Sequence, residues 1–419
     1  MLKCSQAFDP AVTINEEGRE KMKAAIMGYG TIGSGVAEIL RVNRDAIASR
    51  VKEPIELKYV LDLRDFPGDP EEDKLTKNID DIVNDPEVSL VVETMGGVHP
   101  AYEFVRKNLE AGKSVTTSNK ALVADKGAEL VRIAKEHHAN FMFEASVGGG
   151  IPIIRTLCTC LTGDVIEEIT GILNGTTNYM MTDMSENGSD FDEVLRDAQA
   201  QGFAEKDPTA DIEGYDASRK IAILTSLVSG KTVDYKDVPT EGITHIDSMD
   251  MRYAKKMGLT IKLLARMVKT DGGYCCRVAP YLLKPDHPLF SVNGVFNAVF
   301  VKGNMLGDSM YYGSGAGKLP TASAVTADLV SMAINIDRDV TIGWSEEKLS
   351  ISDPMNQENR YFVRARIGIG DISRFFPDAK IIDAGYDNET AFVTGKIREG
   401  AFKEIMDSLG DPVSVIRLA

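Results

Sequence analysis

The feature that most constrains the fold of this chain is a glycine pattern that directly follows a short apolar segment. Residues 24–27 are apolar, and Gly28-Tyr-Gly30-Thr-Ile-Gly33 comes next. In a strand–turn–helix unit the first glycine permits a tight turn, the second lets a pyrophosphate approach the backbone, and the third allows close helix–strand packing. A turn of purely structural glycines is the plainer interpretation. Because apolar residues then recur at helical spacing over 32–40, the context favours a dinucleotide site.

Strand-like and helix-like segments alternate along the first third of the chain. Apolar runs at 55–61, 90–92, 113–117 and 140–143 predict strands, and helical patterns near 99–111 and 122–137 lie between them. This alternation predicts an α/β fold with a doubly wound, mainly parallel sheet over residues 23–146. Residues 1–22 are polar and irregular, so we expect an N-terminal extension there.

After three consecutive glycines at 148–150 the pattern changes to an α+β one. We expect strands at 165–172, 261–269 and 274–282, and helices near 190–201 and 215–229. These segments predict a substrate-binding and dimerisation domain over 147–312, and residues 313–345 are expected to return to the first domain. Residues 350–419 read as strand, helix, strand, strand, helix, strand, which predicts a small ferredoxin-like βαββαβ module.

The bulk composition limits the partners of the chain. Its 47 basic and 63 acidic residues give a net charge of −16, which argues against nucleic acid or an anionic membrane as a partner. We find neither an apolar run of about 18 residues nor the apolar core of a secretory signal, so a cytoplasmic protein is expected. The five cysteines, at 4, 158, 160, 275 and 276, lack zinc-site spacing and are expected to be free thiols.

The densest polar stretch is residues 202–220. It carries a cluster of carboxylates ahead of an apolar helix, among them Glu205, Asp207, Asp211 and Asp216. Asp216 and Lys220 are four residues apart and therefore share one helix face; a solvated surface pair is the plainer interpretation of that spacing. A carbonyl reduction needs a proton donor for the developing alkoxide, and a lysine held by an aspartate can supply it. We therefore expect the chemistry of the chain to centre here.

Over roughly residues 23–345 the chain resembles homoserine dehydrogenase. The motifs that carry the resemblance are residues 28–33, Thr117-Ser-Asn-Lys120, Glu144-Ala-Ser-Val147-Gly-Gly149-Gly-Ile151-Pro152, Ile172-Leu-Asn174-Gly-Thr-Thr177-Asn178, residues 202–220 and Gly313-Ser-Gly-Ala-Gly317. The resemblance implies a Rossmann-type dinucleotide domain. It also implies reversible, NAD(P)-dependent interconversion of L-homoserine and L-aspartate 4-semialdehyde, in threonine, methionine and isoleucine biosynthesis.

The same resemblance implies roles for individual residues. Lys220 would protonate the aldehyde oxygen and Asp216 would orient the substrate beside it. Lys120 would lie near the nicotinamide and share the proton transfer, although a surface lysine at the end of a strand is the plainer interpretation. The implied substrate-binding residues are Glu205, which would hold the ammonium group, Asp211, Gly202 and Asp207.

A cofactor site and a cation site are implied as well. The cofactor-binding residues would be Gly28, Gly30, Thr31, Ile32, Gly33, Asp62, Thr94, Lys120 and Gly317. Asp62 follows the second expected strand and would repel a 2′-phosphate, which favours NAD, whereas Arg64 could face that phosphate in NADP. The residues that match the family's monovalent-cation site are Glu144, Val147, Gly149 and Ile151. A glycine-rich turn there could hold a structural sodium ion through carbonyl oxygens or be a connection without an ion.

The C-terminal unit resembles a degenerate ACT module in its element order. Its expected first helix, near 371–376, is short and Pro377 ends it, so a structural or oligomerising role is favoured over binding of a feedback amino acid. A homodimer or higher homo-oligomer is expected. Two other functions stay open: a related dehydrogenase of another small amino-acid-like carbonyl, and a non-catalytic dinucleotide sensor. The joint presence of Lys120, Glu205, Asp216 and Lys220 argues against the sensor, which needs no proton donor.

Overall fold

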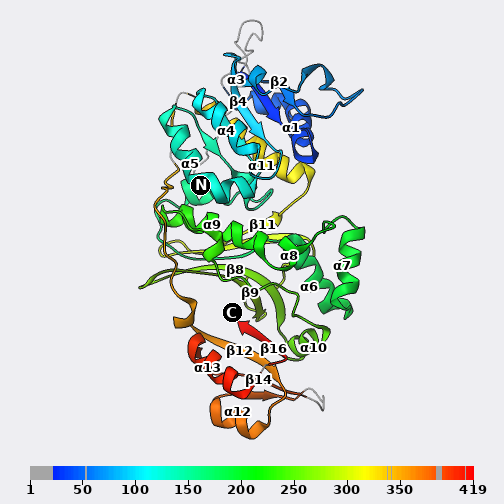
Figure 1. Cartoon of the computed structure of the whole chain (residues 1–419), viewed down its shortest axis with the longest axis vertical. Coiled ribbons are helices and arrows are strands. Elements are labelled where there is room, and N and C mark those ends of the chain that lie inside the picture. Colours follow the sequence, from blue (N-terminus) through cyan, green and yellow to red (C-terminus); the bar gives the residue numbers. More distant parts are fainter. Residues whose placement is uncertain (1–21, 52–53, 337, 341, 384–388, 411) are drawn as a thin grey trace, which may run out of the picture.

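The computed structural model describes residues 22–51, 54–336, 338–340, 342–383, 389–410 and 412–419. Three parts follow one another along the longest axis, coloured blue to cyan, green, and orange to red (Figure 1). The expected N-terminal extension lies outside the described residues, apart from Met22, which already belongs to the first strand.

The first part is built on a parallel sheet. Within the described residues its six strands have the order β3-β2-β1-β4-β5-β6. The elements are β1 (Met22–Met27), α1 (Thr31–Val42), α2 (Arg44–Ala48), β2 (Ile55–Leu61), β3 (Leu75–Thr76), α3 (Asp80–Val83), β4 (Val88–Glu93), α4 (Ala101–Glu110), β5 (Ser114–Thr117), α5 (Lys120–Glu136) and β6 (Phe141–Met142). The predicted α/β class with a parallel sheet is confirmed. The strand order reverses between β1 and β4, which is where sheets of this kind bind ligands.

A helix from much later in the chain packs on this part. α11 (Lys318–Ile334) lies against α1, and its Ala322, Val325 and Leu329 share an apolar core with β1. Gly35 makes the close approach possible, since a Cβ there would lie 2.9 Å from the Cβ of Ala322.

The second part is an antiparallel sheet covered by helices. Its elements are β7 (Ile166–Ile172), α6 (Gly175–Asn187), α7 (Phe191–Ala200), α8 (Thr209–Ile212), α9 (Tyr215–Ser229), α10 (Ser248–Lys256), β8 (Thr260–Thr270), β9 (Gly273–Leu283), β10 (Phe296–Gly303) and β11 (Gly307–Ser314). Its strands have the order β11-β10-β7-β8-β9. The hairpin of β10 and β11 adds two strands to the three expected here. α9 contacts β8 and β9 on one side and α5 on the other, so it lies between the two sheets (Figure 1).

Residues 350–419, called the C-terminal module below, extend this second sheet. The elements are β12 (Glu358–Ala365), α12 (Ile369–Phe375), β13 (Lys380–Ile382), β14 (Thr390–Val393), β15 (Ile397–Arg398), α13 (Glu399–Leu409) and β16 (Ser414–Leu418). The order β16-β12-β14-β13 is antiparallel throughout. β16 also pairs in parallel with β9 through Arg417 and Leu418. One mixed sheet therefore runs through both parts, a continuity that the sequence pattern does not predict.

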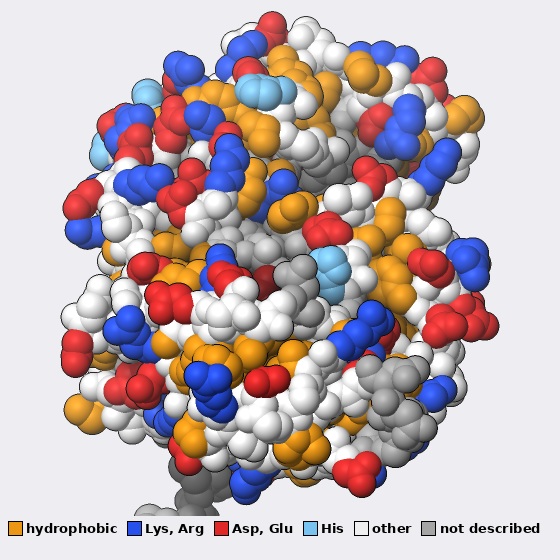
Figure 2. All heavy atoms as spheres, turned by 60° about the horizontal axis from the view of Figure 1, so that its bottom comes forward, with side chains coloured by type: hydrophobic (Ala, Val, Ile, Leu, Met, Phe, Trp, Pro, Cys, Tyr) orange, Lys and Arg blue, Asp and Glu red, His pale blue; other side chains and the backbone are white. Residues whose placement is uncertain are grey.

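The surface of the chain carries both charge signs. On the face seen in Figure 2, basic and acidic side chains are intermixed, with hydrophobic side chains in smaller groups between them. Among the described helices, each is too short or too polar to span a bilayer. The thiols of Cys158, Cys160, Cys275 and Cys276 are free, as predicted, and Cys4 lies outside the described residues.

Candidate active site

Two lysines from different parts of the chain meet on one buried carboxylate. Asp216, the second residue of α9, is 2% exposed. Its Oδ2 lies 2.6 Å from Nζ of Lys220, one helical turn further along, and its Oδ1 lies 2.6 Å from Nζ of Lys120. Because Lys120 is the first residue of α5, this cluster connects the parallel sheet with the antiparallel one.

The loop after β7 completes the cluster. Asn174 donates from Nδ2 to Oδ1 of Asp211 at 2.7 Å and to Oδ2 of Asp216 at 3.0 Å. Its Oδ1 accepts from the backbone of Thr177 at 2.9 Å, so the same side chain caps α6. Nζ of Lys220 also donates to the carbonyl of Leu173 at 2.6 Å. The amide of Asn174 and the carbonyl of Leu173 therefore align the two carboxylates and the Lys220 ammonium.

Burial and charge act in opposite directions on these groups. Burial would raise the pKa of Asp216, but Lys220 and Lys120 hold it below its ordinary value. Burial lowers the pKa of Lys220 despite the attraction of Asp216. For Lys120 the carboxylate outweighs burial and raises the pKa. Burial, together with Asp216, raises the pKa of Asp211. Of the two lysines, Lys220 is thus the one that releases its proton more readily.

The remaining predicted substrate residues lie on an exposed turn. Gly202 follows α7 with φ +76°, and Glu205 and Asp207 are exposed to solvent. Oδ1 of Asp207 accepts from the backbone and the hydroxyl of Thr209, at 3.1 and 2.7 Å, so it shapes the turn into α8. The structure does not bring these three residues into the Lys120–Asp216–Lys220 cluster.

The glycine turn has the geometry of a phosphate site. Gly28 has φ +92°, and a Cβ on Gly33 would lie 2.0 Å from the carbonyl oxygen of Gly28. Thr94, from the end of β4, holds the same carbonyl through Oγ1 at 2.7 Å. A Cβ on Gly30 would meet nothing within 4 Å, so the N-terminus of α1, at Thr31 and Ile32, has an open approach. A pyrophosphate fits there, on the free N–H groups of the helix.

Asp62 lies at the end of β2, as predicted from the strand pattern, but it is paired with Arg64. The guanidinium contacts both carboxylate oxygens, at 3.0 and 2.9 Å, and the backbone of Tyr29 donates to Oδ2 at 2.8 Å. The bonds from Arg64 hold the pKa of Asp62 well below its ordinary value. An acidic residue, which would repel a 2′-phosphate, and a basic residue, which would attract it, therefore lie side by side at this position.

The predicted cation turn lies where two connections between the sheets cross. A Cβ on Gly149 would lie 2.2 Å from the carbonyl oxygen of Gly315, in the 313–317 segment that leads through Gly317 to α11. Glu144 accepts from the backbones of Ile154 and Arg155 at 2.8 and 2.7 Å. Burial and nearby Asp328 raise the pKa of Glu144 to about 7. Each oxygen of this carboxylate thus already accepts a backbone hydrogen bond, and a cation here would depend on backbone oxygens such as those of Val147 and Ile151.

Two further residues of the site, Asn174 and Glu93, are given no role in the sequence predictions. Glu93 ends β4 and is fully buried, and it accepts from the Thr117 hydroxyl at 2.5 Å and the Met95 backbone at 2.7 Å. It shapes the loop beside Lys120. Glu93 is the last residue of β4 and Asn174 lies two residues after β7, so a polar residue at the end of an apolar strand is the signal that could have identified them.

Comparison with known proteins places the chain among enzymes. A family model described as homoserine dehydrogenase, NAD binding domain, matches residues 28–144, and one described as homoserine dehydrogenase matches residues 152–330. A homoserine dehydrogenase of Bacillus subtilis is 38% identical, covering 93% of this chain and 95% of its own. One from Synechocystis is 45% identical over 74% of this chain and 73% of its own.

Solved structures agree with these relatives. A crystal structure of a homoserine dehydrogenase from Thiobacillus denitrificans has a TM-score of 0.88 and 34% identity, covering 95% of this chain and 98% of that one. A hyperthermophilic archaeal homoserine dehydrogenase in complex with NADPH has a TM-score of 0.62 and 28% identity, covering 74% and 97%. The predicted function is confirmed. It is therefore favoured over the two alternatives, a related dehydrogenase of another small carbonyl and a non-catalytic dinucleotide sensor. The chain belongs to the homoserine dehydrogenase family and interconverts L-homoserine and L-aspartate 4-semialdehyde with NAD or NADP.

Proposed function

We propose that the Lys120–Asp216–Lys220 cluster is the chemical centre of this reaction. A bound reduced nicotinamide supplies the hydride. Lys220 gives its proton to the aldehyde oxygen, a role that its lowered pKa supports. Lys120 keeps its proton, since its pKa is raised, and its positive charge stabilises the developing alkoxide. Asp216 holds both ammonium groups in place, and the two 2.6 Å contacts are the observation that carries this proposal.

The substrate would lie over the same cluster. Asp211 faces it through Asn174 and is suited to the ammonium end of the amino acid. The exposed turn that holds Gly202, Glu205 and Asp207 leads directly into α8, so we assign these residues to the rim of the substrate site. Glu205 would contribute a second carboxylate for the ammonium group.

The two lysines give the test of this assignment. In Lys220→Ala the proton donor is lost, and kcat should fall by about 10²- to 10⁴-fold while the KM for cofactor stays within about twofold. Lys120→Ala should also lower kcat, because the alkoxide loses its neighbouring charge. The measurement is initial-rate absorbance of reduced cofactor with L-homoserine and each oxidised cofactor. An unchanged kcat in folded Lys220→Ala would remove this residue from its role.

For the cofactor we propose NAD as the preferred form, with Asp62 as the residue that disfavours NADP. Asp62 holds the Arg64 guanidinium against its own carboxylate, and this pairing keeps the arginine from a 2′-phosphate. We also propose a structural sodium ion at the turn of Glu144, Val147, Gly149 and Ile151. The occupied carboxylate of Glu144 supports coordination by backbone carbonyl oxygens alone.

We further propose that the C-terminal module is a ferredoxin-like, degenerate ACT module with a structural role. If the two-residue strand β15 is left aside and the other four strands are numbered along the module, their order is 4-1-3-2, which supports this assignment. The domains would span 23–146 with 313–345, 147–312, and 350–419. A homodimer would form at β11, which ends the mixed sheet and exposes Met310 and Tyr312. An apolar sheet edge can pair with the same edge of a second copy across a two-fold axis.

A further inference from the structure

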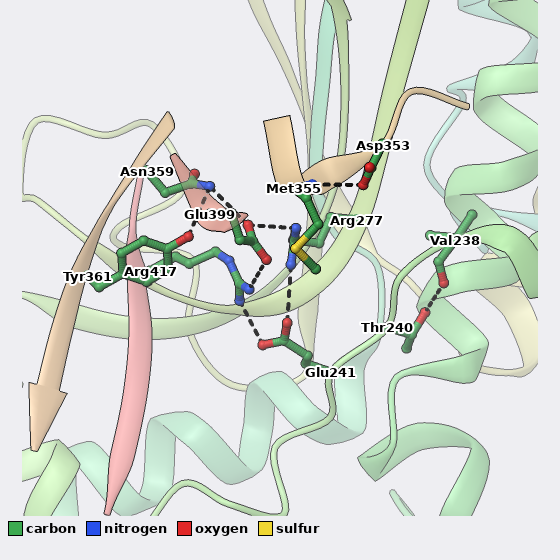
Figure 3. Close-up of polar contacts among 10 residues, drawn as sticks. All are labelled: Val238, Thr240, Glu241, Arg277, Asp353, Met355, Asn359, Tyr361, Glu399 and Arg417. Atoms are coloured by element: carbon green, nitrogen blue, oxygen red, sulfur yellow. Dashed lines mark hydrogen bonds and ion pairs between the residues drawn. The ribbon is translucent and has the colours of Figure 1, made fainter. Parts of the chain in front are cut away.

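Four charged side chains join the C-terminal module to the second part of the chain, from β7 to β11 (residues 166–314), called the substrate part below. Arg277 of β9 contacts Glu241 at 3.1 Å and Glu399 at 2.7 Å. Arg417 of β16 contacts the same two carboxylates, at 2.7 and 2.8 Å. The four side chains point towards one another and form a closed ring, called the junction network below (Figure 3). Two residues of the ring belong to the module and two to the substrate part.

Burial makes the ion pairs of this ring hard to separate. The side chains of Arg277, Arg417 and Glu399 are 5, 7 and 8% exposed, whereas Glu241 is 45% exposed. Removing one member of a buried pair leaves the other charge without compensation, which makes such pairs hard to separate. Burial opposes ionisation of Glu399, but Arg417 and Arg277 hold its pKa below the ordinary value. Nδ2 of Asn359 donates a further bond to Glu399 at 3.2 Å.

The backbone around Glu241 continues from this ring to the substrate site. The N–H of Glu241 donates to Val278 at 2.8 Å, and that of Ile243 donates to the carbonyl of Ile212 at 2.8 Å. A Cβ on Gly242 would lie 2.2 Å from the same carbonyl, so the two segments are in direct contact. Ile212 is the residue after Asp211.

The same segment also contacts the start of α9. A Cβ on Gly214 would lie 3.0 Å from Cγ2 of Thr240. Gly214 has φ +81°, a left-handed conformation that sets the direction in which α9 leaves the turn. Asp216 follows two residues later. Residues 240–243 therefore support the turn between Asp211, which we assign to the substrate site, and Asp216, which holds the two lysines.

We propose that Glu241 is a positioning residue for the dehydrogenase reaction and that the C-terminal module acts on catalysis through it. Arg417, itself held by Glu399, fixes Glu241 from the module side. Glu241 then fixes the turn at 212–214, and with it Asp211 and Asp216. The inference rests on the proposed roles of Asp216 and Lys220. It needs no effector, because docking of the module is itself what sets the turn.

Single-charge variants of the full chain test this inference. Glu241→Gln keeps the shape of the side chain and leaves Glu399 bridging both arginines, so the module stays docked. Glu399→Gln makes the matching change from the module side. Both should lower kcat/KM for L-homoserine by about fivefold or more, with the KM for cofactor within about twofold. A merely structural role would lower the melting temperature without this selective effect.

Asp247→Asn is the matched control. Asp247 also pairs with a buried arginine of the module, since its Oδ1 lies 2.6 Å from Nη1 of Arg364, and its side chain is 51% exposed. It precedes α10 rather than supporting the turn at 212–214, so its kcat/KM should stay within about twofold of wild type. Equal losses in Asp247→Asn and Glu241→Gln, or an unchanged kcat/KM in Glu241→Gln, would overturn the inference.

Lys220→Ala, measured in parallel, distinguishes a failure of the proposed active site from a failure of the positioning role of Glu241. If this variant keeps its kcat, the proposed site is wrong and the inference falls with it. If it loses kcat while Glu241→Gln and Asp247→Asn behave alike, only the positioning role is refuted.

Discussion

At the scale of single residues, the site depends on how Asp216 divides its two oxygens between two lysines. The carboxylate is buried, so its charge is scarcely screened by solvent, and it acts on both ammonium groups at 2.6 Å. The deeper lysine has its pKa lowered and the more exposed one has its pKa raised. Under the proposed roles, one residue type thus serves as proton donor at Lys220 and as fixed charge at Lys120, according to its surroundings.

This arrangement predicts a pH dependence. Oxidation of homoserine requires neutral Lys220, because the alcohol proton must pass to it, so the rate should rise with pH through the pKa of this lysine. Asp216 raises that pKa, and in Asp216→Asn the raising charge is gone. The rising limb of kcat/KM should then move to lower pH by about one unit or more. A pH–rate profile of both proteins measures it, and a limb at unchanged pH would contradict the assignment.

Cofactor choice is also decided by single residues. In Asp62→Asn the partner charge of Arg64 is removed while a side-chain oxygen remains for the Tyr29 backbone. The freed guanidinium should bind a 2′-phosphate, and the ratio of kcat/KM for NADP over NAD should rise by about tenfold. Leu63→Ala, at an exposed neighbouring position, is the control and should leave the ratio unchanged. If both variants give the wild-type ratio, Asp62 does not set the preference.

At the scale of elements, two glycines of the turn from β1 to α1 have different surroundings, so variants of them should affect stability and cofactor binding to different degrees. A Cβ on Gly33 would overlap the carbonyl of Gly28, whereas one on Gly30 would stand in open space. Gly33→Ala should therefore lower the free energy of unfolding by about 1–3 kcal/mol and also weaken cofactor binding. Gly30→Ala should weaken cofactor binding with a loss of stability within about 1 kcal/mol.

Thermal unfolding and fluorescence titration with NADH measure the two effects in both variants. Tight cofactor binding in folded Gly30→Ala would show that the phosphates do not lie against this turn. A Gly33→Ala variant as stable as the wild type would show that the turn relaxes without cost.

At the scale of the whole molecule, one mixed sheet joins the substrate part to the C-terminal module. Within this sheet β16 joins β9 and brings the C-terminal module against the substrate part. The apolar core is continuous across this junction, since Phe362 and Ile416 of the module share a cluster with Ile261 and Val278. The module is therefore built into the enzyme rather than attached by a linker, and this is why its contacts can act on the site.

The end of the sheet formed by β11 should be the dimer interface. Tyr312→Lys places a charge on the exposed edge strand, where it would face its own copy across a two-fold axis. Sedimentation should then show monomers where the wild type gives dimers. Ile369→Lys is the control, since this residue is equally exposed but lies on α12 in the module. A dimer that survives Tyr312→Lys would place the interface elsewhere.

What the sequence determined by itself is what local patterns encode. The apolar alternation and the 28–33 glycines predict the parallel sheet and its phosphate turn, because strand period, helix period and turn chemistry are properties of neighbouring residues. The spacing of Asp216 and Lys220 likewise predicts their pairing on one helix face, which the structure has at 2.6 Å.

Only the tertiary structure decided which distant segments meet. Lys120 reaches Asp216 because α5 and α9 pack together, and Asn174 joins them from the end of β7. The pairing of β16 with β9 and the ring of Glu241 with Arg417 depend on contacts between residues far apart in the chain. No spacing along the sequence specifies such contacts, since they arise from the joint packing of whole elements. The site is therefore visible in the sequence as separate residues, and it becomes one site only in the fold.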